Sequence, residues 1–237
     1  VYNTYFVVRG DNEWARKHPE EAQRIFLLSN RNLATTESLE IEIMRGFLKD
    51  EFDPDYAYID LWEVYDRTTG IKHEKWGYNS INGIVTIENA IPFHEYTVTF
   101  LARVTWHPVQ IYNYLTNEWT CEKQLTYDPA FPATKKYIVE HMKKWCEENP
   151  ETSVVRFTTF LYQFTLIFNN LGKERQVEWF GYGQTANPVL MEEFENESGI
   201  HLFAEDFVDS GSYNNCFRNP TEKFLKYMDF VERFVSK

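Results

Sequence analysis

The sequence has no run of about 18 consecutive apolar residues, so nothing in it predicts a membrane-spanning helix. No secretory signal peptide is visible at its start. Positive charge is in short supply, because 24 Lys and Arg stand against 36 Asp and Glu and leave a net charge of −12. This balance disfavours a nucleic-acid partner and an anionic membrane surface. A phosphate-containing ligand stays open, since a local arginine pocket can act against the overall charge.

Cysteine is scarce, and the chemical motifs that depend on spacing are missing. Cys121, Cys146 and Cys216 are odd in number and far apart, which predicts neither a disulfide framework nor a metal site. Free thiols in a reducing cytoplasm are the simplest interpretation. The six histidines show no ligand spacing, and there is no glycine-rich phosphate loop or nucleophile elbow. We therefore expect a cytoplasmic protein without a metal site.

Aromatic residues, in contrast, are abundant. They make up 17% of the chain, with 7 Trp, 15 Tyr and 19 Phe. Flat aromatic faces can cover the C–H side of a sugar ring, so this content favours a carbohydrate site. A large aromatic core is the alternative explanation.

The first half of the chain predicts short strands. Residues 1–8 read as a strand, 61–76 as a hairpin, and Asn82-Gly83 as a tight turn before another strand. Alternating side chains predict a longer strand over 96–106. We therefore expect a first segment, residues 1–95, that is rich in β-structure.

From residue 96 onward the pattern changes to strands alternating with helices. A helix is predicted over 132–148, which ends at Asn149-Pro150, and two more begin at Asn187-Pro188 and Asn219-Pro220. Such alternation predicts βα units with a parallel sheet, so residues 96–237 form the second segment. The last helix reaches Lys237 without a stop signal, which indicates that the native polypeptide continues.

A closed eight-stranded βα barrel needs about 250 residues, so this chain can hold only part of one. The predicted fold class is therefore α/β: an incomplete (β/α)8 TIM-type barrel, its N-terminal portion, with a β-rich lead-in. Functional residues of such a barrel follow the carboxyl ends of its strands. The segments 107–113, 158–163 and 181–184 stand at such positions.

The stretch 153–184 carries the polar and aromatic groups that suit a sugar. Arg156 and Gln163 can reach hydroxyl groups, while Trp179 and Tyr182 offer ring faces. Seven residues separate Arg156 from Gln163, so both can line one pocket only if the strand ends near Phe157. The alternative is a buried strand in which backbone groups satisfy both side chains.

Several carboxylates flank aromatic residues, among them Glu13, Glu118 and Glu178. A glycosidase needs two carboxylates that face the scissile bond. Spacing alone does not choose a pair.

Six segments together resemble the family of 1,3-β-galactosyl-N-acetylhexosamine phosphorylases, also called lacto-N-biose phosphorylases. They are NTYFVVRGDNEW (3–14), HEYTVTFLA (94–102), WHPVQIYNYLTNEW (106–119), VVRFTTFLYQFTL (154–166), VEWFGY (177–182) and EDFVDSGSYNN (205–215). They run through nearly the whole chain in the same order as in the family.

The resemblance implies the N-terminal part of a catalytic βα barrel and an inverting phosphorolysis. Phosphate attacks the anomeric carbon of a β-galactoside while a general acid protonates the leaving oxygen, which yields α-galactose 1-phosphate and a free sugar. One catalytic acid suffices, because phosphate replaces the activated water of an inverting hydrolase. The partners implied are the disaccharide and inorganic phosphate, with no metal or organic cofactor and with a possible homodimer of the full-length enzyme.

The resemblance also places substrate-binding residues. Arg156, Gln163 and Trp179 match the galactose side, and Val109, Asn113 and Tyr182 match the acceptor side, where Asn113 would meet an N-acetyl group. The general acid of the family, an Asp in a GDQW-like motif, is absent and is expected beyond Lys237, so no catalytic residue is assigned.

Two positions depart from one member of the family: His107 stands where that member has Asp, and Tyr182 where it has Cys. Both flank the implied acceptor pocket, which leaves open N-acetylglucosamine, N-acetylgalactosamine or L-rhamnose as the acceptor. The hypotheses are a disaccharide phosphorylase, a galactosyl-rhamnose phosphorylase, a β-galactosidase-type hydrolase, or a carbohydrate-binding fragment without turnover. In each catalytic case, we expect the isolated chain to be inactive.

Overall fold

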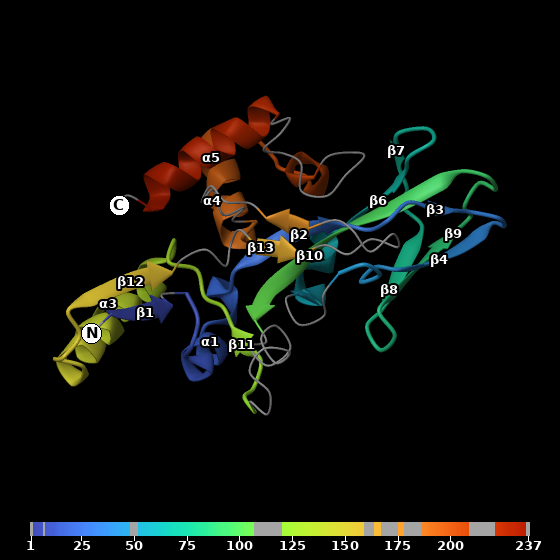
Figure 1. The fold of residues 1–237 in the computed structure, drawn as a ribbon. Helices are drawn as coiled ribbons and strands as arrows, with labels where there is room; N and C mark the ends of the chain where they lie inside the picture. Colours follow the sequence, from blue (N-terminus) through green and yellow to red (C-terminus); the bar gives the residue numbers. More distant parts are fainter. Residues whose placement is uncertain are drawn as a thin grey trace.

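The structure is a computed structural model of the 237-residue chain. It describes residues 2–6, 8–47, 52–106, 120–158, 164–166, 175–177, 186–208 and 221–235. Figure 1 shows a long antiparallel sheet that reaches from the centre of the molecule to one end, with a parallel strand pair at the other end.

The strand β10 (Glu95–Trp106) is the axis of the antiparallel sheet, and its bounds confirm the predicted strand. It pairs with β2 (Arg24–Leu28), β3 (Asn32–Leu33), β5 (Phe52–Pro54), β6 (Glu63–Asp66) and β11 (Gln124–Leu125), always antiparallel. Residues 96–102 of β10 are buried on both faces. The alternation in the sequence therefore marks two covered faces and no solvent face.

Two predicted hairpins are confirmed. β6 turns into β7 (Ile71–Lys72) through Gly70, and β8 (Trp76–Asn79) turns into β9 (Ile84–Glu88) through Asn82-Gly83. Gly83 has a φ of 71°, a left-handed conformation that glycine adopts without steric cost. Strand β4 (Ser38–Glu42) completes a three-stranded sheet, in the order β4-β9-β8.

The strands β1 (Tyr2–Phe6) and β12 (Val154–Thr158) form the one parallel pair among the described strands. Their register runs from Tyr2 opposite Val154 to Phe6 opposite Thr158. The chain between them contains the antiparallel sheet and the helix α3 (Pro132–Glu148), whose bounds are those predicted. A parallel pair joined through a helix is the connection that βα barrels repeat.

The described strands do not close into a barrel, which agrees with the predicted incomplete barrel. One expectation needs correction: β10 was predicted to open the parallel sheet, but it is antiparallel to all of its described partners. Side-chain alternation assigns faces and leaves the direction of the neighbouring strands open. The division at residue 95 stays a prediction.

The region around residues 53–60 precedes β6. It contains the end of β5 and the 3-10 helix η2 (Tyr56–Leu61). Pro54 is accommodated in β5 because it lies at the last position of a short strand.

The helices α4 (Pro188–Ser198) and α5 (Glu222–Val235) lie next to each other and cover the sheet together with η4 (Ala204–Phe207) (Figure 1). Asn187 caps α4 as predicted, since its side chain accepts from the Val189 N–H, and Gly199 ends the helix with a φ of 69°. At α5 the hydroxyl of Thr221 accepts from the Phe224 N–H, while the predicted start at Asn219-Pro220 lies outside the described residues.

Aromatic side chains join these helices to the sheet in one core. Phe194 of α4 meets Tyr227 of α5 at 5.4 Å between ring centroids, and Phe207 of η4 meets Phe26 of β2 at 4.9 Å. Burying a side chain of this size contributes roughly 1.5–3 kcal/mol. Part of the aromatic content of the sequence is therefore explained by packing.

In the described part of the chain, no helix is both long and apolar enough to cross a membrane. Further segments of the structure are the 3-10 helix η1 (Pro19–Glu21), α1 (Asn12–Lys17), and the antiparallel pair of β13 (Phe164–Leu166) with β14 (Arg175–Val177). Cys121 and Cys146 are exposed free thiols, and Cys216 lies outside the described residues.

Candidate substrate site

The carboxyl ends of β1 and β12 lie side by side, because the two strands are parallel and in register (Figure 1). β1 ends at Phe6 and β12 at Thr158. In βα barrels the active site is built from the segments that follow such strand ends. The residues around 8–11 therefore stand at the edge where βα barrels build their sites, while the residues that directly follow Thr158 lie outside the described part of the chain.

Arg156 is the predicted site residue that the structure describes. It lies in β12 opposite Thr4 of β1, and its side chain is exposed. β12 is described as far as Thr158, and residues 159–163 lie outside the described part of the chain, so whether Arg156 and Gln163 line one pocket stays a prediction. The other predicted residues lie outside the described part of the chain: Val109, Asn113, Gln163, Trp179 and Tyr182, together with His107 and Glu178.

Arg9 is a residue near the end of β1 to which the sequence alone assigned no role. It is only 5% exposed, and its guanidinium lies 4.8 Å from the centre of the Trp106 ring. Its Nη1 donates a hydrogen bond to Oε1 of Gln124, and its backbone forms a β-bridge with Thr126. The only signal in the sequence was an arginine that follows a predicted strand and precedes a glycine. The residues that this arginine contacts are about 100 positions away along the chain.

The Arg9 contacts fall on the two strands that flank residues 107–119. Trp106 is the last residue of β10, Gln124 is the first of β11, and the two are paired in antiparallel register. The backbone N–H of Tyr127 also donates to the Val8 carbonyl at 3.0 Å. The end of β1 is thereby fixed to both strands that lead into and out of that segment.

A second cluster lies beside it, between α1 and α3. Asp11 caps α1 by accepting from the Trp14 N–H at 2.9 Å, and it also accepts from the hydroxyl of Tyr137. The rings of Trp14 and Tyr137 stack at 4.0 Å with an interplanar angle of 5°. Burial raises the pKa of Asp11, but the hydrogen bonds from Tyr137 and Trp14 outweigh it and hold the pKa below its ordinary value.

One group of described side chains has the composition of a metal site. His18, Glu20 and Glu21 place ligand atoms within 4.8 Å of one another. The carboxylate of Glu21, however, accepts from both the backbone N–H (3.0 Å) and the hydroxyl of Thr134 at the first turn of α3. A metal ion there would compete with a helix cap, so we give this group a structural role.

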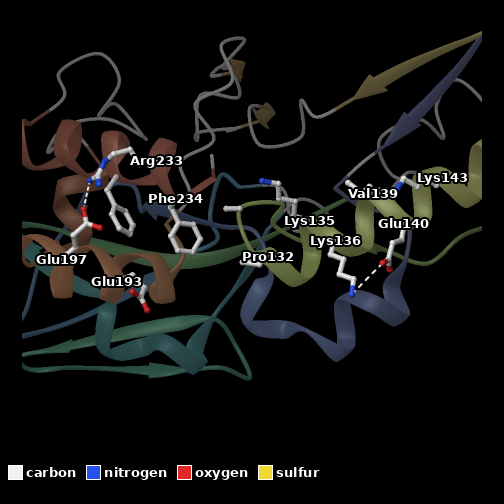
Figure 2. Close-up of a pocket in the computed structure, with 12 residues that line it drawn as sticks. Pro132, Lys135, Lys136, Val139, Glu140, Lys143, Glu193, Glu197, Arg233 and Phe234 are labelled. Atoms are coloured by element: carbon white, nitrogen blue, oxygen red, sulfur yellow. Dashed lines mark ion pairs between the residues drawn. The ribbon is translucent and has the colours of Figure 1, made fainter. Parts of the chain in front are cut away.

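A cavity of about 590 Å³ lies between α3 and the pair α4–α5 (Figure 2). Figure 2 shows Arg233 facing Glu197 and Lys136 facing Glu140, at 2.7 Å and 3.9 Å. Its walls are helix flanks, lined by Ala130, Pro132, Lys135, Lys136, Val139, Glu140, Lys143, Glu193, Glu197, Phe230, Arg233 and Phe234. None of the site residues predicted from the sequence is among them.

The parallel pair, the helix that connects it and the open edge together define this chain as part of a βα barrel. The chain belongs to the family described as the lacto-N-biose phosphorylase N-terminal TIM barrel domain, whose model matches residues 1–237. This confirms both the predicted family and the predicted fold class.

Curated relatives in the same family are disaccharide phosphorylases. The chain is 42% identical, over 100% of its length and 34% of the relative, to a 1,3-beta-galactosyl-N-acetylhexosamine phosphorylase of Lachnoclostridium phytofermentans. It is 39% identical, over 99% of its length and 32% of the relative, to the 1,3-beta-galactosyl-N-acetylhexosamine phosphorylase of Bifidobacterium longum. A D-galactosyl-beta-1->4-L-rhamnose phosphorylase of L. phytofermentans is 34% identical over 99% of the chain and 33% of the relative. The chain thus spans about a third of the length of the curated relatives it matches.

Proposed function

We propose that the polypeptide carrying this chain is an inverting disaccharide phosphorylase. It converts a β-galactosyl-(N-acetyl)hexosamine and phosphate into α-galactose 1-phosphate and the free sugar. The observation that carries the proposal is the match of the family model to residues 1–237, joined by identities of 38–42% to relatives named for this activity.

The reaction is a single displacement at the anomeric carbon. A phosphate oxygen forms the new bond to that carbon from the face opposite the leaving oxygen, and the glycosidic C–O bond breaks. A general acid transfers its proton to the leaving oxygen, which departs as the hydroxyl of the free sugar. The β configuration of the galactoside becomes the α configuration of the phosphate ester. Inorganic phosphate is a substrate, and the proposal needs no metal or organic cofactor.

Six side chains of this chain are assigned to substrate binding. Arg156, Gln163 and Trp179 hold the galactose unit through hydrogen bonds and a stacked ring, as their chemistry allows. Val109, Asn113 and Tyr182 contact the acceptor sugar. The exposed position of Arg156 on β12, opposite Thr4 of β1, supports its share of this assignment. We assign the general acid to none of the carboxylates in this chain and place the reaction in the cytoplasm of the producing cell, in an enzyme that forms homodimers.

The test is phosphate dependence of turnover by the complete polypeptide. Lacto-N-biose and galacto-N-biose are each incubated with and without phosphate, and galactose 1-phosphate and free galactose are measured separately. We expect galactose 1-phosphate only when phosphate is present. Free galactose without phosphate would identify a hydrolase, and sugar binding without either product would identify a binding protein; each result contradicts the proposal.

A second candidate is a galactosyl-rhamnose phosphorylase. It is favoured by the 34% identity to a D-galactosyl-beta-1->4-L-rhamnose phosphorylase and by His107 and Tyr182, which depart from one member of the family beside the assigned acceptor residues. The same assay with β-1,4-galactosyl-L-rhamnose separates the two. Preference for the rhamnose disaccharide would replace the hexosamine acceptor and leave the reaction type unchanged.

A further inference from the structure

Arg9 is a buried cation that contacts the strands β10 and β11 and the residue Thr126. Its guanidinium stacks on Trp106 at 4.8 Å, its Nη1 donates to Gln124, and its backbone bridges to Thr126. With 5% of its surface exposed, its guanidinium is held in the interior of the protein. Burying a guanidinium is costly unless each of its contacts is well placed.

The two residues whose side chains contact Arg9 are directly opposite each other in a strand pair. Trp106 closes β10, Gln124 opens β11, and the two are in register. A shift of either strand end would break the stack or the hydrogen bond, so the guanidinium fixes the spacing between them. Arginine suits this task better than lysine, because its planar fork can stack and donate at the same time.

The same residue fixes that strand pair to the end of β1. The bridge to Thr126 and the neighbouring hydrogen bond from Tyr127 to Val8 continue the contact along the chain. β1 pairs in parallel with β12, the strand that carries Arg156. Arg9 therefore connects the Trp106–Gln124 pair, through β1, to that strand. The assigned acceptor residues Val109 and Asn113 follow Trp106 by three and seven positions in the sequence.

We propose that Arg9 is a positioning residue for acceptor selection, acting through Trp106 and Gln124 without touching either substrate. This inference rests on the proposed phosphorylase function and deepens it. A displacement of about 1 Å in a substrate-positioning group can lower a rate by about a hundredfold. Loss of the Arg9 contacts should therefore weaken use of the acceptor sugar and leave the galactosyl side nearly unchanged.

The experiment uses the complete polypeptide in the synthetic direction, with α-galactose 1-phosphate and free N-acetylglucosamine, N-acetylgalactosamine or L-rhamnose as the second substrate. For Arg9→Lys we expect the KM for the preferred acceptor to rise about tenfold, while the KM for galactose 1-phosphate and kcat change by less than about threefold. The differences in kcat/KM among the three acceptor sugars should become smaller as well. Equal increases of both KM values, or unchanged kinetics, would overturn the inference.

Two further variants keep the test decisive. Gln124→Met removes the hydrogen-bond acceptor but keeps the side-chain volume, and it should reproduce the acceptor-specific rise in KM even if Arg9→Lys does not fold. If it folds and leaves the acceptor KM unchanged, the inference is wrong. Arg16→Gln is the matched control, because Arg16 makes an exposed ion pair with Glu122, two residues before Gln124, and its loss should leave both KM values unchanged. Absence of phosphate-dependent turnover in the unsubstituted protein, in contrast, would overturn the proposed function itself and the inference with it.

Discussion

The guanidinium of Arg67 and the carboxylate of Glu205 form a bidentate ion pair, with Nη1–Oε2 at 2.8 Å and Nη2–Oε1 at 2.7 Å. Arg67 also donates through Nε to the Thr97 hydroxyl at 2.6 Å, and its side chain is only 6% exposed. The pair joins the turn after β6 to η4, although 138 residues separate the partners. It is thus a connection between the antiparallel sheet and the helical layer.

Glu205→Gln should loosen this connection. The substitution leaves the Arg67 guanidinium buried opposite a neutral amide, and we expect a loss of about 3 kcal/mol in the free energy of unfolding. Urea denaturation of the complete polypeptide, followed by tryptophan fluorescence, measures it. Glu95→Gln is the control, since Glu95 pairs with Arg31 where both side chains are about half exposed and should cost less than about 1 kcal/mol. Equal losses in the two variants would show that burial does not set the strength of these pairs.

Asp55 offers a sharper comparison, because one carboxylate serves two arginines. Its Oδ2 lies 2.8 Å from Nε of Arg24, which is 2% exposed, and its Oδ1 lies 3.3 Å from Nη2 of Arg103, which is 39% exposed. Arg24 donates in addition to the carbonyls of Pro19, Glu20 and Ala22. We expect Arg24→Gln to lower the free energy of unfolding by at least about 3 kcal/mol, and Arg103→Gln by about 1 kcal/mol or less.

The same urea denaturation series decides this second prediction. The two variants remove the same group type from the same carboxylate, so the difference between them measures burial and the three extra hydrogen bonds. A larger loss for Arg103→Gln would contradict the role we give to the Arg24 network.

The sequence predicted those helices and strands that are fixed by residues close together along the chain. The bounds of α3 follow from Pro132 and from Asn149-Pro150, and the cap of α4 follows from Asn187. The alternation that predicts β10 depends on neighbouring residues within one strand. In each of these cases the interaction that fixes the element lies within a few positions along the chain.

Relationships between distant residues were beyond these patterns. The direction of the partners of β10 and the pairing of β1 with β12 depend on contacts between residues far apart in the sequence, such as Thr99 with Leu28 and Tyr2 with Val154. The sequence alone assigned no role to Arg9, because Trp106 and Gln124 reach it only in the folded chain. For the candidate site, Arg156 lies on β12 opposite Thr4 of β1, and all six substrate-binding assignments stay predictions.

Tyr137→Phe should give a pH-dependent loss of stability. The substitution removes the hydroxyl that donates to Asp11 but keeps the ring that stacks on Trp14. The pKa of Asp11 is lowered in the folded protein, so its ionised form contributes stability above the ordinary value of 3.8 and loses it as the pH falls through the folded pKa. We expect the variant to be less stable than the unsubstituted protein by about 1 kcal/mol at pH 7, and the difference to shrink at pH 3.

Urea denaturation at the two pH values measures this difference. Tyr56→Phe provides a control in which an exposed tyrosine loses its hydroxyl, and it should show no such dependence on pH. A Tyr137→Phe difference that stays constant from pH 7 to pH 3 would mean that the hydroxyl does not stabilise the Asp11 carboxylate.

Arg156→Lys tests the galactose side of the assigned site. Lysine keeps the positive charge but loses the planar fork that can donate two parallel hydrogen bonds to adjacent oxygens. In the complete polypeptide we expect kcat/KM for phosphorolysis to fall by about a hundredfold, with the same relative fall for every acceptor sugar in the disaccharide. This uniform loss distinguishes Arg156 from Arg9, whose substitution should affect the acceptors unequally. A side chain that binds galactose must act equally whatever sugar leaves. A fall in kcat/KM that differs strongly between hexosamine and rhamnose disaccharides would therefore move Arg156 to the acceptor side. Unchanged kinetics would remove Arg156 from the site.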